Sequence, residues 1–326
     1  MKKKITELTV KIPLVTEEDL LHNELNMYLL YLEAGIFISN KDKEFSHSEL
    51  DIIQFYGIIN RIQSCFKSIR QACNFISRRP TIKYLDKNEE MTIIDYYNYH
   101  YDVVVHKLNT IRDLSFKLIN KVFNLNLSDR NCNWNNIKSN NLITIPGIID
   151  IQTLYYYLML EVERERNEST HNGFIKAKIF DDLNDIVTLS QLNRLKKVPK
   201  EIVGYDPLTK GTYYDSQLRK EKKELLKKID NYKVMSLFCI NVLTCCMSNK
   251  YKSSIPTDLS TKYSSFIQKA NYQIDNYGKK VNKLKFLFPF LEINDKSIEY
   301  LKGNGKKGNY KLGCQVCAHN SIQFFG

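Results

Sequence analysis

The sequence predicts an all-α protein, a helical bundle of four to six long helices. Residues that break helices are scarce, with 12 Gly and 7 Pro among 326 residues, whereas average usage gives about 23 Gly in a chain of this length. Between Gly57 and Pro146 the only such residue is Pro80. Apolar residues also recur at steps of three and four along almost the whole chain, which is the helical period. An all-β sandwich or barrel, which needs many turns, is therefore excluded.

Each helix is predicted from its own apolar stripe. In the first long stripe, Ile52, Phe55 and Ile59 recur at helical spacing, and Pro80 closes the segment. Asn-rich residues 129–141 are typical of a loop. The expected helices are residues 17–35, 46–80, 94–125, 149–171, 181–195, 215–247 and 259–277.

Composition divides the chain into three parts. An amino-terminal helical extension, 1–45, precedes a helical bundle, 46–250, and a basic, helical and partly flexible carboxy-terminal extension follows, 251–326. Residues 302–313 hold four Gly and four Lys with little to bury, so we expect this segment to be mobile.

The charge of the chain indicates polyanionic partners. Lys and Arg number 48 against 36 acidic residues, which gives a net charge of +12, and 251–326 alone carry 12 Lys against 5 acids. Such a surplus attracts RNA and DNA first, and anionic membrane surfaces second. The alternative is that Lys-rich composition follows from AT-rich codons, in which case the charge carries no functional meaning.

Apolar patterning predicts a soluble protein in the cytoplasm, with no membrane partner. No run of 18 apolar residues occurs, and the amino-terminal residues lack the apolar core of a secretory signal. The eight cysteines are accordingly expected to be reduced thiols.

The segment with the most chemical information is the end of the helix expected at 149–171. On a helical projection Arg166 falls within the apolar arc that contains Tyr155, Met159 and Val162. An arginine that continues an apolar stripe either extends to solvent or faces an interface where its charge has a task. His171 follows five residues later, about 140° around an ideal helix.

The residues Arg166-Asn167-Glu168-Ser169-Thr170-His171 resemble the Arg-polar-x-His motif of the HEPN superfamily. This chain has the common Arg-Asn form, on a helix of an all-α bundle, and the resemblance covers 46–250. It implies a HEPN-like fold and a metal-independent endoribonuclease that uses Arg166, Asn167 and His171 and needs no cofactor. It further implies RNA as substrate, a 2′,3′-cyclic phosphate product, a homodimer, and the role of a bacterial toxin or anti-phage effector with an antitoxin or regulatory partner.

The chemistry of RNA cleavage needs these residue types. When the 2′-hydroxyl attacks the neighbouring phosphate, one proton must be removed, another donated, and charge on the phosphate offset. His171 is suited to the proton transfers at neutral pH, and Arg166 is suited to the phosphate oxygens. Neither task requires a metal.

Several alternatives remain open. Arg164 also has an allowed spacing to His171, although Glu165 follows it. The charged helix end is also consistent with a solvated face rich in salt bridges. The alternative hypothesis for the function is a non-catalytic HEPN-like module that binds RNA or a partner protein.

Two weaker constellations accompany the motif. Asp102 and His106, four residues apart on one helix, are interpreted as a structural pair, and Asp113 is a guess for a supporting polar residue near the motif. The spacing typical of half a zinc site occurs at Cys314, Cys317 and His319. A structural zinc site, however, needs four ligands. We therefore assign no metal.

Overall fold

The computed structural model describes residues 8–11, 16–40, 44–78, 80, 92–145, 147–172, 177–180, 183, 211–277, 313–317 and 321–325. Contacts divide the chain into two compact units. Unit 1 comprises Met1–Phe66, Leu108–Glu161 and Asn231–Gly326, and unit 2 comprises Lys67–Lys107 and Val162–Asp230. The division of the sequence into 1–45, 46–250 and 251–326 is a different one and stays a prediction.

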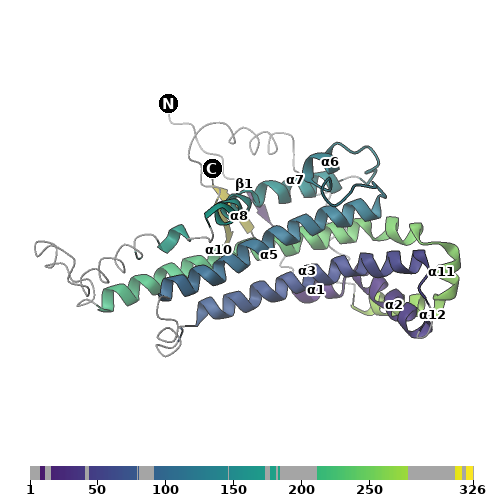
Figure 1. Ribbon diagram of the computed structural model, residues 1–326, viewed down its shortest axis with the longest axis horizontal. Helices are drawn as coiled ribbons and strands as arrows, with labels where there is room; N and C mark the ends of the chain where they lie inside the picture. The colour runs from purple at the N-terminus through teal and green to yellow at the C-terminus, as the bar shows by residue number, and fades with distance from the viewer. Residues whose placement is uncertain are drawn as a thin grey trace, which may run out of the picture. The chain divides into compact units, whose positions relative to one another are not determined.

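The predicted all-α class is confirmed, although the described residues contain three long helices where the sequence predicts four to six (Figure 1). In chain order the described elements are β1 (Leu8–Lys11), α1 (Glu17–Leu21), α2 (Glu24–Ser39), α3 (His47–Ser77), α5 (Ile93–Val122), α6 (Trp134–Lys138), α7 (Ile148–Leu158), α8 (Leu160–Asn172), the 3₁₀ turn η1 (Lys178–Phe180), α10 (Gly211–Ser254), α11 (Thr257–Lys262), α12 (Ser264–Tyr277), β2 (Gly313–Cys317) and β3 (Ser321–Phe325).

Two of the long helices begin at reciprocal caps. At the start of α3 the Ser46 backbone N–H donates to Glu49 (2.8 Å), and the Glu49 N–H donates to the Ser46 hydroxyl (3.3 Å). At the start of α5 Thr92 and Asp95 make the same pair of contacts, at 2.9 and 3.1 Å. Each pair satisfies backbone donors that have no partner inside the helix.

Three segments predicted as single helices are each divided into two. The breaks follow Leu21, which ends α1, and lie at Met159 and at Tyr263. The Asn23 side chain caps α2 by accepting from the Asn26 N–H at 2.9 Å. Met159 and Tyr263 are fully buried, so the apolar stripe continues through both bends and periodicity does not reveal them.

Two further differences concern residues 129–141 and 181–195. The predicted loop 129–141 contains the short helix α6, whose Trp134 and Ile137 are buried. The helix expected at 181–195 lies outside the described residues except for Leu183.

A small antiparallel sheet is present where the sequence predicts no strand. Its order is β1-β3-β2, with Leu8 opposite Phe324 and Gly313 opposite Phe325. The strands have only 4, 5 and 5 residues, too few for alternation to stand out from helical stripes. The pairing also joins the two ends of the chain, which local pattern does not encode. The segment expected to be mobile, 302–313, lies outside the described residues except for Gly313.

In unit 1, helix α12 packs closely against α2 at a glycine. A Cβ atom added to Gly35 would lie 2.9 Å from the Phe266 ring and 3.1 Å from the Tyr263 ring. Real Cβ atoms essentially never approach another heavy atom so closely. Gly35 therefore permits the close contact of these two helices.

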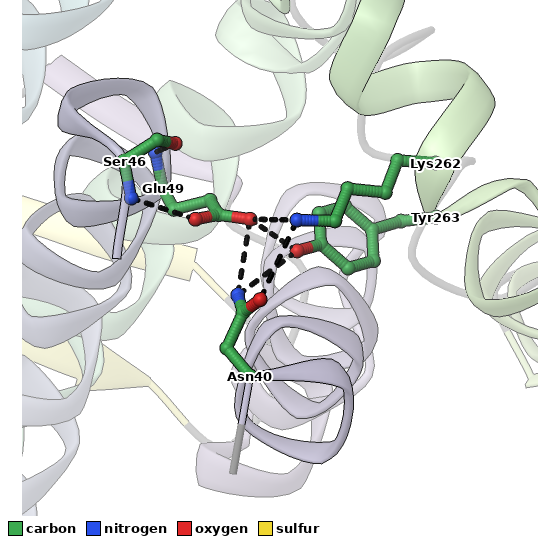
Figure 2. A network of polar contacts seen from close by, with 5 residues as sticks. All are labelled: Asn40, Ser46, Glu49, Lys262 and Tyr263. Carbon is green, nitrogen blue, oxygen red and sulfur yellow. Dashed lines mark hydrogen bonds and ion pairs between the residues drawn. The ribbon is translucent and has the colours of Figure 1, made fainter. Parts of the chain in front are cut away.

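A saturated polar network joins the ends of α2, α3 and α11 in unit 1 (Figure 2). One carboxylate oxygen of Glu49 accepts from Lys262 Nζ (2.7 Å), from the Tyr263 hydroxyl and from the Asn40 amide (3.1 Å). The other oxygen accepts from the Ser46 N–H. Only 2% of the Glu49 side chain is exposed, so this carboxylate exchanges water almost completely for protein donors.

The network keeps Glu49 ionised. Burial alone would raise the pKa of Glu49, but the hydrogen bonds from Lys262, Tyr263, Ser46 and Asn40 outweigh it and hold that pKa well below its ordinary value. The same contacts raise the pKa of Lys262. Because both charges are paired and hydrogen-bonded, the network acts as a structural clamp.

Candidate active site

The candidate site lies on α8, which begins after a bend at Met159. The Met159 N–H donates to the Tyr155 carbonyl (3.1 Å), closing α7, and α8 starts at the next residue. From Val162 onward α8 belongs to unit 2. The same unit contains the carboxy-terminal part of α3, the amino-terminal part of α5 and the first half of α10. All six motif residues are thus in unit 2.

One face of α8 is held by polar contacts to α5 and α10. The Glu165 carboxylate accepts from the Tyr101 hydroxyl (2.6 Å) and from Lys228 Nζ (2.9 Å), with 13% of its side chain exposed. One turn later the buried Ser169 hydroxyl donates to Asp102 Oδ1 at 2.8 Å. Residues four apart share a helix face, so these two contacts fix the rotation of α8 about its axis.

The ammonium of Lys228 has a second role in this anchor. It lies 5.7 Å above the centre of the Tyr101 ring while it contacts Glu165. A cation over an aromatic face gains electrostatic attraction. Tyr101 therefore stabilises both members of the ion pair, the anion through its hydroxyl and the cation through its ring.

The motif residues Arg166 and Asn167 are brought together beside this face. Arg166 is partly buried and donates from Nη2 (3.2 Å) and Nε (3.4 Å) to the Asn167 amide oxygen. Asn167 is exposed, and so is Thr170, whose hydroxyl donates to the Arg166 carbonyl at 3.0 Å. The two donors of the guanidinium converge on one oxygen, so Asn167 orients the arginine at the surface of the helix.

His171 lies on α8 as predicted, because the helix continues to Asn172. An early end or a kink of the helix would bring His171 back toward Arg166. The described helix is regular through both positions, so an ideal geometry keeps them about 140° apart. On the same geometry the position of His171 is about 20° from that of Arg164, which is exposed. The choice between Arg164 and Arg166 as motif arginine therefore remains open.

Asp102 is the polar residue on a neighbouring helix that contacts the motif. Sequence reasoning named Asp102 and His106 as a structural pair and guessed Asp113 for the supporting role. Asp102 accepts from Ser169 of the motif, and His106 Nε2 lies 3.6 Å from the same oxygen. Asp113 contacts Arg112 in unit 1 (3.1 Å). The i, i+4 spacing revealed the Asp102–His106 pair, but a contact to Ser169, 67 residues away, leaves no local signal.

The apolar arc beside Arg166, which would suit the contact of a homodimer, is already covered within one chain. Tyr155, Met159 and Val162 are 0%, 0% and 1% exposed. A two-fold contact through these three side chains is therefore wrong. The projection assumed one straight helix, whereas the bend at Met159 directs these side chains into the core.

Neither a metal site nor a membrane span is found in the described parts of the chain. Within them, no three His, Cys, Asp or Glu side chains are grouped so as to hold a metal ion. Cys314 and Cys317 belong to strand β2, while His319 lies outside the described residues. None of the described helices is both long and apolar enough to span a bilayer.

No family model, curated protein or solved structure matches the chain. The HEPN hypothesis therefore depends on the motif residues and on the helical fold of this chain.

Proposed function

We propose that this protein is a metal-independent endoribonuclease of the HEPN type. It would cleave RNA by attack of a 2′-hydroxyl on the adjacent phosphate, leaving a 2′,3′-cyclic phosphate and a 5′-hydroxyl. The observation that carries the proposal is the motif helix itself. Glu165 and Ser169 hold one face of α8, while Asn167 orients Arg166 beside that face.

Each motif residue has a role that follows from its chemistry. His171 transfers protons to and from the reacting oxygens, since imidazole titrates near neutral pH. Arg166 offsets the charge that develops on the phosphate oxygens. Asn167 is a positioning residue that acts through the guanidinium. Asp102 is a second positioning residue, because it fixes the rotation of α8 through Ser169.

The proposal includes a homodimer in which two motif helices line one cleft. Because Tyr155, Met159 and Val162 are buried, such a contact would use other, exposed residues of α8, among them Asn167 and Glu168. By analogy with the HEPN superfamily the protein would act as a toxin or anti-phage effector in the cytoplasm, restrained by an antitoxin or regulatory partner.

The first test is cleavage of single-stranded RNA in excess EDTA. We expect His171→Ala to lower the cleavage rate by about 10²–10⁴-fold, the usual contribution of acid–base catalysis, and Arg166→Ala to lower it by about 10²–10³-fold, the usual contribution of one group that stabilises developing charge. Arg164→Ala removes the same charge two residues away and is the matched control. Mass spectrometry of the fragments reports the 2′,3′-cyclic phosphate.

Three results would change the proposal. A larger loss in Arg164→Ala than in Arg166→Ala would move the motif by two residues within the same mechanism. Loss of wild-type cleavage in EDTA would refute the metal-free mechanism. Equal cleavage by the wild type and His171→Ala would favour the non-catalytic binding module. So would the absence of cleavage by both proteins if they still bind RNA.

A further inference from the structure

Unit 2 presents a cluster of aromatic rings at its surface. Phe75 on α3 is 46% exposed and Tyr99 on α5 is 62% exposed. His100 stacks on Phe75 with ring centroids 4.7 Å apart and 12° between planes, and Tyr99 meets His100 edge-on at 5.3 Å. Tyr96 supports His100 from beneath with a second edge contact, at 4.6 Å. Neighbouring rings thus hold each other in fixed positions while two of them remain open to solvent.

The imidazole in this cluster behaves as an aromatic ring and not as a cation. Burial lowers the pKa of His100 below its ordinary value. His100 is therefore uncharged at neutral pH and presents a flat ring beside Phe75. An uncharged ring stacks on a nucleobase as other aromatic side chains do.

Exposed cations also lie on the part of α3 that carries Phe75. From Lys67 to Arg78 the sequence contains no Asp or Glu. The exposed side of this segment carries Lys67, Arg70 and Arg78 together with neutral polar side chains and Phe75. A solvated helix face normally mixes both signs of charge, so a purely basic strip beside exposed rings indicates an anionic ligand.

Helix α10 adds a second basic strip next to the first. Lys222 Nζ donates to the Ser77 carbonyl at the end of α3 (3.0 Å) and lies 5.9 Å from the Tyr97 ring centre. These contacts place α10 beside both α3 and α5. The exposed cations of this part of α10 fall within an arc of about 100° on an ideal helix; they are Arg219, Lys220, Lys223 and Lys227.

The exposed acidic residues of this part of α10 are fewer than its exposed cations. Glu221 is buried, and Glu224 and Asp230 are exposed. Among the described residues, no recorded ion pair involves the surface cations Lys67, Arg78, Arg219, Lys220, Lys223 or Lys227. Their charge is therefore available to an external anion.

We infer that the surface formed by Phe75, Tyr99 and His100 with the basic strips of α3 and α10 binds single-stranded nucleic acid. Bases stack on the rings and phosphates lie along the cations, the combination that single-strand binding requires. That the strand is RNA rests on the proposed function. The binding itself does not, because no motif residue belongs to this surface.

The composition of the surface favours a nucleic acid over a lipid membrane. In the described part of unit 2, Phe75 and Tyr99 are the exposed large apolar residues, and neither is aliphatic. Membrane surfaces are bound by helices that insert a continuous apolar face including aliphatic side chains. A small cluster of rings bordered by cations instead fits bases flanked by phosphates.

The test measures binding of a fluorescein-labelled 20-nucleotide oligouridine to the full-length protein by anisotropy. The His171→Ala background keeps the strand intact. We expect the double variant Phe75→Ala/Tyr99→Ala to bind about 30-fold more weakly or worse, since stacking on one ring contributes about 1–3 kcal/mol per base and the variant removes two rings. The conservative pair Phe75→Tyr/Tyr99→Phe keeps both rings and should restore the affinity.

Two controls separate this surface from general effects. Phe37→Ala/Tyr272→Ala removes two equally exposed rings from unit 1 and should leave the affinity unchanged. Arg78→Ala should lower the slope of log affinity against log salt by about 0.7, the value for one phosphate contact on a single strand. Circular dichroism confirms that each variant is folded.

The inference is overturned by wild-type protein that does not bind the oligouridine, by equal losses in the unit 1 control, or by binding to anionic phosphatidylserine vesicles in place of RNA. Equal affinity for the matching oligodeoxyuridine supports the surface but removes its preference for RNA. Failure of the two proposals is distinguishable. If the wild type binds RNA but does not cleave it, only the proposed ribonuclease activity is refuted. If the Phe75→Ala/Tyr99→Ala variant keeps both its RNA affinity and its cleavage activity, only the proposed binding surface is refuted.

Discussion

The Glu49 network of unit 1 and the motif helix of unit 2 use similar residues in opposite ways. Both contain a carboxylate that accepts from a lysine and from a tyrosine hydroxyl. Around Glu49 every contact lies at the meeting of helix ends, and the side chain is only 2% exposed. Around Glu165 the contacts hold one face of a helix whose other residues include the exposed Asn167.

The difference separates a structural role from the functional role that we propose for α8. A polar network that is saturated and buried stabilises a fold and leaves no group for a substrate. A helix anchored on one face only keeps its other polar groups accessible. The same pairing of acid, lysine and tyrosine thus serves as a clamp in unit 1 and as a support for other residues in unit 2.

The largest expected effect on stability is that of Glu49→Gln. The substitution removes the negative charge that Lys262 and Tyr263 contact. The new amide also places an N–H donor close to groups that are themselves donors. Leaving buried donors without their charged acceptor lowers the free energy of unfolding by about 3 kcal/mol, while Lys262, whose side chain is 47% exposed, keeps part of its hydration. Urea denaturation followed by circular dichroism measures this loss of stability. Asp129→Asn, which breaks an exposed pair with Lys117, should cost about 1 kcal/mol or less. Equal effects would abolish the contrast between buried and exposed pairs.

Acidity should remove the same stabilisation without a mutation. The pKa of Glu49 is lowered in the folded state, so its contribution is fully present above the pKa of an unfolded glutamate, about 4.3. It is lost as pH falls below that value toward the folded pKa. The difference in melting temperature between wild type and Glu49→Gln should therefore shrink between about pH 5 and pH 3. A constant difference over that range would contradict the ionised carboxylate.

Ser169→Ala tests the anchor of the motif helix. It removes a hydrogen bond to a carboxylate, worth about 1.5–3 kcal/mol, and leaves α8 freer to rotate. We expect lower stability and, in the cleavage assay, a reduced rate at unchanged RNA affinity. Thr170→Ala removes a neighbouring hydroxyl that contacts only its own helix and should change stability by about 0.5 kcal/mol or less. If both variants behave alike, Asp102 has no positioning role.

The smallest effects distinguish two helical glycines. Gly35→Ala places a Cβ 2.9 Å from the Phe266 ring and should destabilise unit 1 by about 1–3 kcal/mol through overpacking. Nothing lies within 4 Å of a Cβ added to Gly57, so Gly57→Ala should stabilise α3 by about 0.5–1 kcal/mol. Thermal denaturation of the two variants gives shifts of opposite sign. Shifts of the same sign would show that Gly35 is not a close-contact position.

The helical class was predictable because helix formation is read from neighbouring residues. The apolar stripes and the scarcity of breakers located the ends of α3 and α5 within three residues and those of α10 within seven. The motif was found in the same way, since Arg166, Asn167 and His171 stand within six residues. What escaped was every feature that depends on distant contacts, namely the bends at Met159 and Tyr263 and the sheet between the two chain ends.

The polar residues show the same division most clearly. Local spacing was enough to predict Arg166 as the residue that contacts phosphate and to pair Asp102 with His106 on one helix face. Folding alone assigned Asp102 to Ser169, Glu165 to Tyr101 and Lys228, and Glu49 to Lys262. A hydrogen bond between residues 60 or more positions apart depends on how helices pack. Periodicity reports which face of a helix is apolar, whereas packing determines which partner that face meets.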